Sequence, residues 1–377
     1  MTVTRFSFPT AIHFGAGARQ LVAEHLWERG IERPLVVTDK GLAALPILAD
    51  FQSGLTGLTV ATYSGVFGNP VKSQVDEGVA AYKAHGADCV IGFGGGAALD
   101  VAKAVALMAV HDGGVMEYAW DHPRAREITN ALPYFIALPT TSGTGSEVGR
   151  SSVISDDATH VKKIIFSPAL LARAVFADPE LTLGLPRAIT AATGLDALTH
   201  NVESYLSPAY HPLCDGIALE GARIAAQALV KAVKDPGNLQ ARSDMMMSSL
   251  MGAIAFQKDL GAVHSCAHAL GTVVDMHHGL ANGIMIDHVM RFNAPSAQLK
   301  MNELARVCRA GDTPGDFIAW LAHLKAEVGI PAKLAAKGVN RSHIAALVEV
   351  AINDTCHQTN PRPCTRADFE RIFAEAI

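Results

Sequence analysis

The stretch DCVIGFGGGAALDVAKAVALMAV, residues 88–110, decides the fold class of this chain. It begins with an apolar run that reaches three consecutive glycines, and it continues with apolar residues at the three- and four-residue steps of a helix. Similar short runs rich in β-branched residues alternate with helical patterns along the first half of the chain. This alternation predicts a mainly parallel sheet with crossover helices. Strands are expected over residues 34–39, 58–66, 88–96, 134–141 and 174–179, and helices over 75–86 and 99–110.

The pattern changes after Thr182. The segments that follow have helical periodicity, and none has the alternation of a strand. With 377 residues, the chain exceeds the size of one comfortable hydrophobic core. We therefore expect an α/β domain over residues 1–183 and an all-helical domain over residues 184–377, with the boundary between Thr182 and Pro186.

The composition limits the classes of partner. Charged residues make up 18% of the chain, the formal net charge is -5, and no basic stripe or polybasic tail is present. These features argue against nucleic acid and anionic membranes and favour a small molecule. The longest uncharged run, residues 128–146, is broken by prolines and glycines and does not fit a membrane span. The six cysteines form no CxxC pair and the N-terminus lacks a secretory pattern, so a cytoplasmic location is expected.

The glycines 94–96 form a strand-to-helix turn that can bind a phosphate. Glycine lets the backbone approach a ligand closely, and the helix N-terminus offers free N–H groups. A glycine triplet alone is weak support, because tight turns also use glycine for steric reasons. Asp39 ends the apolar run PLVVTD, where a carboxylate accepts hydrogen bonds from ribose hydroxyls and repels a 2'-phosphate. It favours NAD over NADP, although an ordinary strand-end aspartate is the alternative interpretation.

A second polar loop, PTTSGTGSE at residues 139–147, follows another apolar run. Its hydroxyls, glycines and backbone donors suit phosphate, ribose and amide groups, and the alternative is a flexible loop without a ligand. The usual dinucleotide fingerprint GxGxxG with a later acidic residue is absent. The stretch FGAGARQ at residues 14–20 follows no complete strand–helix unit and is interpreted as a turn. Cofactor binding therefore implies a different variant of the α/β fold.

Histidines and one aspartate gather in two apolar segments of the second half. Asp196 and His200 lie four residues apart in a helical pattern, which places both on one helix face. His264 and His268 repeat this spacing. Any one buried histidine is more often a hydrogen-bonded core residue than a metal ligand, and Asp196 with His200 fits an ordinary ion pair.

Taken together, these residues favour one shared metal ion. Without it each buried group would need its own partner, because an unpaired one costs about 1–3 kcal/mol. Three imidazoles and a carboxylate suit ferrous iron or zinc and leave a position open for substrate, whereas calcium and magnesium prefer more oxygen ligands. Spacing alone does not rank the candidates. They are Asp196, His200, His264, His268 and His278, with His277 as an uncertain neighbour.

The chain resembles the iron-containing (group III) alcohol dehydrogenase family from about residue 5 to its C-terminus. The resemblance rests on several specific motifs. They are GGGxxxDxAK at residues 94–103, PTTSGTGSE at 139–147, Asp178, Pro179, Leu181 and Thr182 of a DP-L-T turn, GLDALTHxxE at 194–203, GxxHxxAHxLG at 261–271, HHGxxN at 277–282, and TNPR at 359–362.

The resemblance implies a Rossmann-like α/β N-terminal domain that binds a dinucleotide and an all-α C-terminal domain that binds a metal, in a dehydroquinate synthase-like fold. It implies Fe(II), with zinc possible, and NAD. The implied metal ligands are Asp196, His200, His264 and His278, the last preferred to His277 because it directly precedes Gly279. The implied catalytic residues are His264 and His268, with His268 beside the reacting carbon. The implied cofactor-binding residues are Asp39, Gly94, Gly95, Gly96, Asp100, Thr140, Thr141, Ser142, Thr144 and Lys162.

The expected function is metal-dependent, NAD-linked oxidation of a small primary alcohol, diol or hydroxy acid. The metal would lower the pKa of the alcohol so that the alkoxide releases hydride to NAD, and His268 would orient the substrate or pass on a proton. The alternatives are a zinc-dependent glycerol dehydrogenase, a dehydroquinate synthase-like lyase and a non-catalytic NAD-binding protein. The lyase would need a basic cluster, but Lys258 is the only cation between Gly252 and Asp287.

Some residues depart from the pattern of the family. Ala97 and Ala269 replace a serine and a proline, Asp287 stands where an apolar stretch often continues to a proline, and none of the three is an implied ligand. Asp259, shortly before His264, stands where relatives carry a small or polar residue, so the substrate preference stays open. By resemblance we expect a homodimer or larger homo-oligomer, for which the alternating segment of residues 4–15 offers an exposed strand.

Overall fold

The computed structural model describes residues 8, 10–159 and 161–377. The chain forms two compact units. The α/β unit contains the described residues of Pro9–Thr141 and Gly145–Thr182. The helical unit contains Leu183–Ile377 together with Phe8 and Ser142–Thr144. The short segment Ser142–Thr144 therefore belongs to the helical unit, although the sequence predicts it within the α/β domain.

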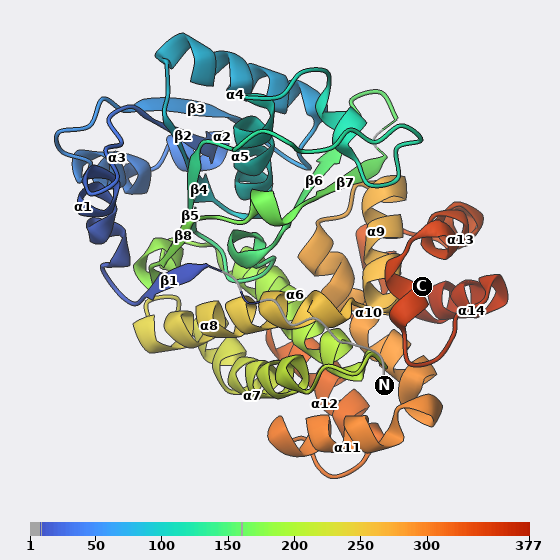
Figure 1. The fold of residues 1–377 in the computed structure, drawn as a ribbon. Coiled ribbons are helices and arrows are strands. Elements are labelled where there is room, and N and C mark those ends of the chain that lie inside the picture. The colour runs from blue at the N-terminus through green and yellow to red at the C-terminus, as the bar shows by residue number, and fades with distance from the viewer. Residues whose placement is uncertain (1–7, 9, 160) are drawn as a thin grey trace. The chain divides into compact units, whose positions relative to one another are not determined.

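The α/β unit is built on a six-stranded sheet with the order β1-β8-β5-β4-β2-β3, in which every neighbouring pair is parallel (Figure 1). This confirms the predicted parallel sheet; β2 has the predicted bounds, and the other four predicted strands are shorter than predicted. The strands are β1 (Ala11–Phe14), β2 (Pro34–Asp39), β3 (Ala61–Val66), β4 (Cys89–Gly94), β5 (Tyr134–Pro139) and β8 (Ala174–Ala177).

Helices cover both faces of this sheet, because alternate residues of a strand point to opposite faces. Ile91 and Phe93 of β4 pack in one core cluster with Phe51 of α3. On the other face, a Cβ atom on Gly92 would lie 2.9 Å from Leu99 of α5, so α5 approaches the strand closely. The helices of this unit are α1 (Val22–Trp27), α2 (Lys40–Ala43), α3 (Pro46–Ser53), α4 (Lys72–His85) and α5 (Gly96–Met108).

Strand β1 is the main correction to the sequence analysis of this unit. Ala11 pairs with Ala174 of β8, so part of the segment expected to be a free strand lies at the edge of the chain's own sheet. The stretch of residues 14–20 consequently follows a strand that was not predicted, and it contains the predicted turn, at residues 15–17, before it leads toward α1. Arg19 in this stretch forms an ion pair with Asp178 at 2.6 Å, which ties the turn to the end of β8.

A two-stranded antiparallel hairpin was also missed. It consists of β6 (Ser151–Ser155) and β7 (Lys162–Phe166). The strands are short and carry serines and lysines, so they lack the apolar alternation that predicts a half-buried strand. The hairpin is fixed to α5, because Asp100 accepts a hydrogen bond from Val153 N at 3.1 Å.

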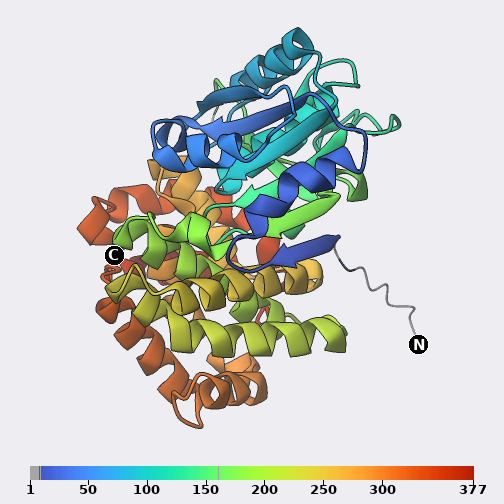
Figure 2. The same cartoon turned by 90° about the vertical axis from the view of Figure 1, so that its left-hand side faces the viewer.

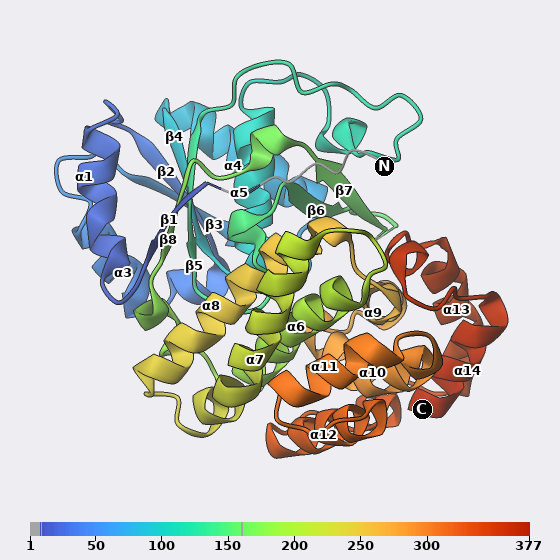
Figure 3. The ribbon, with the colours of Figure 1, turned by 60° about the horizontal axis from the view of Figure 1, so that its bottom comes forward.

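The helical unit contains no strand after Thr182, in a stretch that the structure describes completely, as predicted. Helices α7 and α8 lie side by side, as the yellow-green and yellow helices of Figure 2 show. Helices α11 and α12 pair in the same way (Figure 3). The helices are α6 (Arg187–Leu206), α7 (Pro212–Lys234), α8 (Leu239–Ala255), α9 (Ala262–Val274), α10 (His278–Asn293), α11 (Gln298–Val307), α12 (Pro314–Glu327), α13 (Ile344–Asn353) and α14 (Arg366–Ala376).

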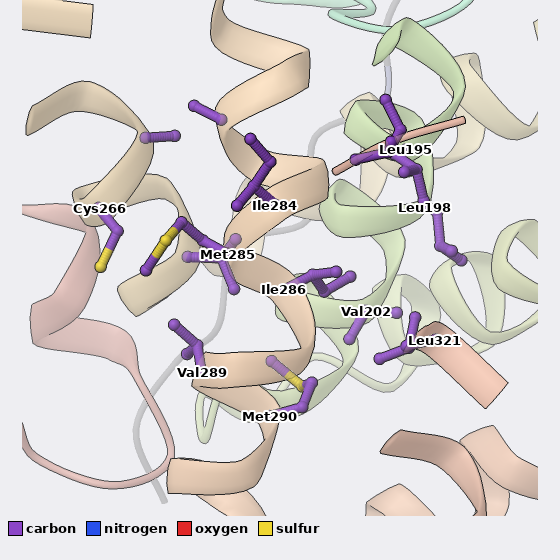
Figure 4. Packing of buried hydrophobic residues seen from close by; sticks show 14 of the residues in the cluster. Leu195, Leu198, Val202, Cys266, Ile284, Met285, Ile286, Val289, Met290 and Leu321 are labelled. Atoms are coloured by element: carbon purple, nitrogen blue, oxygen red, sulfur yellow. The ribbon is translucent and has the colours of Figure 1, made fainter. Parts of the chain in front are cut away.

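Helix α6 is the central element of this unit, since every residue from Thr190 to Leu206 is buried. It packs against α7, α8 and α10. Figure 4 shows the packing of buried side chains on α6 and α10, among them Leu198, Val202 and Ile286. Among the described residues, no helix combines the length and apolar character that a membrane crossing needs.

The unusual Asp287 has a structural explanation. Lys325 of α12, whose side chain is 2% exposed, forms an ion pair with Asp287 and donates a hydrogen bond to Ile284 O at 2.7 Å. Arg291 approaches the same carboxylate at 3.4 Å from the helix surface. The departure at position 287 is therefore compensated by a buried lysine far along the chain.

We predict that Lys325→Met destabilises the protein, because it leaves Asp287 buried with only the half-exposed Arg291 as counter-charge. Breaking a buried pair costs about 3–5 kcal/mol, and the lower end is expected here. Urea unfolding followed by circular dichroism measures the loss. Arg366→Met, which breaks the exposed pair with Glu349, should leave the free energy of unfolding nearly unchanged. Equal losses in the two variants would contradict the prediction.

Candidate metal centre and dinucleotide-binding loops

Four side chains from three helices of the helical unit meet at one point. Each offers one ligand atom, and these atoms lie within 4.8 Å of one another. The Asp196 Oδ1 atom lies 3.9 Å from Nε2 of both His200 and His264 and 3.5 Å from Nε2 of His278. These distances leave room for one ion that contacts all four atoms. The structure thus brings together the four residues that the resemblance implies as ligands.

The local sequence explains how the helices position these ligand atoms. Asp196 and His200 are one turn apart on α6, and His278 is the first residue of α10. Gly279 allows the start of α10 to approach α6, since a Cβ atom on it would collide with the backbone carbonyl of Ala192. A larger residue at position 279 would push His278 away from Asp196.

Two of the imidazoles are held by hydrogen bonds at the nitrogen opposite the ligand atom. His200 Nδ1 lies 3.2 Å from Gly143 O, and His264 Nδ1 lies 2.6 Å from the buried carboxylate of Glu203. Because a carbonyl or carboxylate oxygen accepts, each Nδ1 donates and each Nε2 keeps its lone pair for a metal. Gly143 and Glu203 were not predicted to have this role, although Glu203 lies three residues from His200 on the same helix.

The electrostatics fit a bound cation. Asp196 is buried, and no lysine or arginine among the described residues forms an ion pair with it. Burial lowers the pKa of His200 to about 4, so this imidazole is neutral near pH 7, as a metal ligand must be. A buried carboxylate surrounded by imidazoles needs a positive charge, and a divalent ion with affinity for nitrogen and oxygen supplies it.

His268 lies beside this group. Its ring stacks on that of His278 at 5.3 Å, and its Nδ1 donates to Asp354 at 2.8 Å. Asp354 also accepts hydrogen bonds from Ser265 Oγ at 2.7 Å and from Cys356 N at 2.9 Å. Although burial raises the pKa of Asp354, His268 and these donors hold it well below its usual range. Asp354 therefore stays ionised and fixes the orientation of His268.

His277 has a different role from its neighbour. It caps the N-terminus of α10, where its Nδ1 accepts a hydrogen bond from Leu280 N at 3.4 Å, and it is not part of the four-residue group. Asp354 was not identified from the sequence, because it lies 86 residues from His268 and no local spacing connects the two.

The α/β unit presents the predicted glycine turn. Gly94 has φ +155°, and a Cβ atom on it would lie 2.7 Å from that of Ala98, so the turn requires glycine. Gly95 caps α5 without a side chain, and Gly96 is the first residue of the helix. Asp39 ends the adjacent strand β2, with its Oδ2 atom 3.5 Å from that Cβ position, so the structure brings Asp39 and the glycine turn together.

The second loop connects to this turn. Thr140 N donates to Gly94 O at 3.0 Å, and Thr141 packs beside Gly95. Ser142 and Thr144 belong to the helical unit. Lys162 is the first residue of β7, and its neighbour Lys163 forms an ion pair with Asp121 at 2.7 Å. Of the predicted residues in this loop, Thr140 and Thr141 therefore contact the glycine turn within the α/β unit.

Asp100 contacts the protein itself at both carboxylate oxygens. It accepts from Ser146 Oγ at 2.6 Å and from Val153 N at 3.1 Å. The buried Lys103 donates to the same Ser146 Oγ at 2.9 Å and to Ser151 O at 2.7 Å. Asp100 and Lys103 of the GGGxxxDxAK motif therefore hold the end of the polar loop and the start of the hairpin in place.

Comparison with known proteins agrees with this architecture. The family model described as iron-containing alcohol dehydrogenase matches residues 9–179, and the C-terminal model of the same family matches residues 190–377. A 4-hydroxybutyrate dehydrogenase from Cupriavidus necator is 38% identical, with 98% of each chain covered.

Solved structures show the same similarity. A 1,3-propanediol oxidoreductase is 34% identical with a TM-score of 0.95, and 100% of both chains is covered. A sulfoacetaldehyde reductase from Bifidobacterium kashiwanohense, solved in complex with NAD+, is 27% identical with a TM-score of 0.90, and the match covers 100% of this chain and 99% of that one. These matches do not favour a glycerol dehydrogenase-like or dehydroquinate synthase-like enzyme. This chain belongs to the iron-containing alcohol dehydrogenase family and is a metal-dependent, NAD-linked alcohol dehydrogenase.

Proposed function

We propose that this enzyme transfers hydride between NAD and a small primary alcohol, diol or hydroxy acid at a centre that holds Fe(II). The observation that supports this most directly is the buried meeting point of one carboxylate and three imidazoles, two of which have their Nδ1 atoms fixed by acceptors. The proposed metal ligands are Asp196, His200, His264 and His278.

The donor set fits ferrous iron and also zinc, and the family favours iron. When bound, the ion supplies the Lewis acidity that lowers the pKa of an alcohol hydroxyl. Glu203 and Gly143 O hold the rings of His264 and His200 by their Nδ1 atoms, so that each Nε2 would be available to a metal ion. His268, whose side chain is 24% exposed and is held by Asp354, orients the substrate or passes its proton to solvent.

In the α/β unit, we propose that the glycine turn and Thr140 and Thr141 bind the dinucleotide. Free N–H groups at the start of α5 suit the pyrophosphate, and Asp39 suits the adenosine ribose. We also propose contributions from Ser142, Thr144 and Lys162. For Asp100 we propose an indirect contribution, because its contacts hold the loop that contains Ser146.

Cellular location and assembly are further parts of the proposal. The described cysteines are all free thiols, which supports a reducing compartment such as the cytoplasm. Strand β1 lies at the edge of the sheet, so its open side supports pairing between copies in a homodimer or larger homo-oligomer.

We predict that His264→Ala removes bound iron and reduces NADH formation more than the 10–100-fold that loss of an outer partner typically costs, because a direct ligand is lost. Metal analysis and anaerobic assays with 1-propanol measure both effects. His288→Gln is the control, since His288 is a buried histidine of α10 that contacts Ala332 O and lies outside the four-residue group. Full iron content and activity in His264→Ala would contradict the assignment.

We predict that Glu203→Gln weakens iron binding by about 10–100-fold, because the amide no longer fixes the His264 tautomer as a carboxylate does. Activity should return at raised iron concentration, as the four ligands remain. Titration of the metal-free protein with ferrous iron, followed by activity, measures the shift. An unchanged affinity would show that the Glu203 contact does not orient the ligand.

We predict that Asp39→Asn raises the kcat/KM ratio of NADP to NAD by about tenfold, because it removes the negative charge that repels a 2'-phosphate. Asparagine still caps α2, where Asp39 accepts from Leu42 N at 2.9 Å, so the turn is retained. Initial rates with the two cofactors at equal substrate measure the ratio. Asp121→Asn, which changes an acid paired with Lys163, serves as the control.

A further inference from the structure

Asp259 has a backbone conformation that a residue with a side chain rarely adopts. Its φ is 66° and its ψ is -179°, a combination that is essentially restricted to glycine. A non-glycine residue persists there only when its surroundings enforce the conformation, and such positions cluster at functional sites. A contribution to stability therefore does not explain the strained backbone at Asp259.

The surroundings of Asp259 connect it to the metal group. It follows a short 3-10 turn, Phe256–Lys258, and precedes α9. The ring of Phe256 lies 5.3 Å from that of His200. At the other end, a Cβ atom on Gly261 would lie 2.7 Å from Oε1 of Glu203, the carboxylate that holds His264. Both ends of the segment thus contact residues that form or support the metal group.

The residue before Asp259 is firmly anchored. Lys258 is buried, and its Nζ forms an ion pair with Asp215. Its carbonyl accepts a hydrogen bond from Ser207 Oγ at 2.6 Å. These contacts, together with the hydrogen bond from Asp259 N to Phe256 O at 2.8 Å, hold the backbone in its strained form.

The Asp259 carboxylate differs from the other acids of this region in its hydrogen bonds and ion pairs. In the part of the chain that the structure describes, it has no hydrogen-bond donor and no ion pair, whereas Asp196, Glu203 and Asp354 all have partners. The residue is exposed, yet enough protein surrounds the carboxyl group that desolvation raises its pKa. A carboxylate that is partly desolvated and has no partner is stabilised when a bound ligand donates a hydrogen bond to it.

The charges nearby define which ligand group fits. Between Gly252 and Asp287 the only lysine or arginine is Lys258, which is already paired with Asp215. The metal group itself adds one acid, Asp196, and no lysine or arginine. A hydroxyl or ammonium group is therefore favoured beside Asp259, and a carboxylate is disfavoured.

We propose that Asp259 is a specificity residue that accepts a hydrogen bond from the far end of the substrate, so that the enzyme selects diols and amino alcohols over hydroxy acids of the same length. The inference rests on the proposed function, because it assigns the far end of a substrate whose reacting hydroxyl is at the metal centre. The proposal also accounts for the strained backbone, because the anchored segment fixes the position of the carboxylate.

The test compares four-carbon substrates that differ only at the far end. Values of kcat/KM are measured for 1,4-butanediol, 4-amino-1-butanol and 4-hydroxybutyrate, each divided by that for 1-butanol. The native enzyme should prefer the diol and the amino alcohol to the acid. Asp259→Asn keeps the size and removes the charge, so the ratio for 4-hydroxybutyrate should rise about tenfold and that for 4-amino-1-butanol should fall about tenfold.

Equilibrium binding provides a readout that does not depend on turnover. Calorimetric titration of the iron-loaded enzyme with 4-amino-1-butanol should show weaker binding in Asp259→Asn. Failure to turn over any of the four alcohols would contradict the proposed function, whereas the binding comparison would still test the role of Asp259.

Two glycine variants separate specificity from strain. Asp259→Gly relieves a positive φ beside the centre, and Arg309→Gly relieves one of 56° at an exposed position between α11 and α12. Both should raise the Tm by about 2 °C. Only Asp259→Gly should change the substrate ratios. Ratios and affinities in both Asp259 variants that stay within about twofold of the native values would overturn the proposal.

Discussion

The negative charge of Asp196 is the constraint on which the helical unit depends. A carboxylate inside an apolar bundle is costly unless a cation compensates it, and no lysine or arginine among the described residues does so. Three imidazoles surround it instead, and two of them are fixed by acceptors at Nδ1. The buried helix α6 and the close approach of α10 at Gly279 both position this group.

Residues placed by local geometry could be predicted from the sequence. The four-residue spacing of Asp196 and His200 puts both on one face of α6, and the glycines 94–96 mark the turn after β4. The alternation of runs rich in β-branched residues with helical patterns predicted the parallel sheet. In contrast, spacing could not separate His264 from His268, because both lie on the same face of α9. In the structure, His264 is buried and belongs to the four-residue group, whereas the ring of His268 is partly exposed and lies outside that group.

Features that depend on distant parts of the chain could not be predicted. Strand β1 is too short to stand out, and it is defined by pairing with β8, far along the chain. Asp287 appeared anomalous until Lys325 was found beside it. Similarly, the tripeptide Ser142–Thr144 belongs to the helical unit because of packing such as that of Gly143 against Thr193, which no local pattern encodes.

The acids of the helical unit differ in function because they differ in partners. Glu203 and Asp354 each accept several hydrogen bonds from the protein, and each of them orients a histidine. Asp287 forms a buried ion pair with Lys325, which joins α10 to α12. Among the described residues, Asp259 has neither kind of partner, and its backbone is strained where glycine would be relaxed. A side chain that costs stability and is left unsatisfied by its own protein is most simply explained by a contact with something that binds.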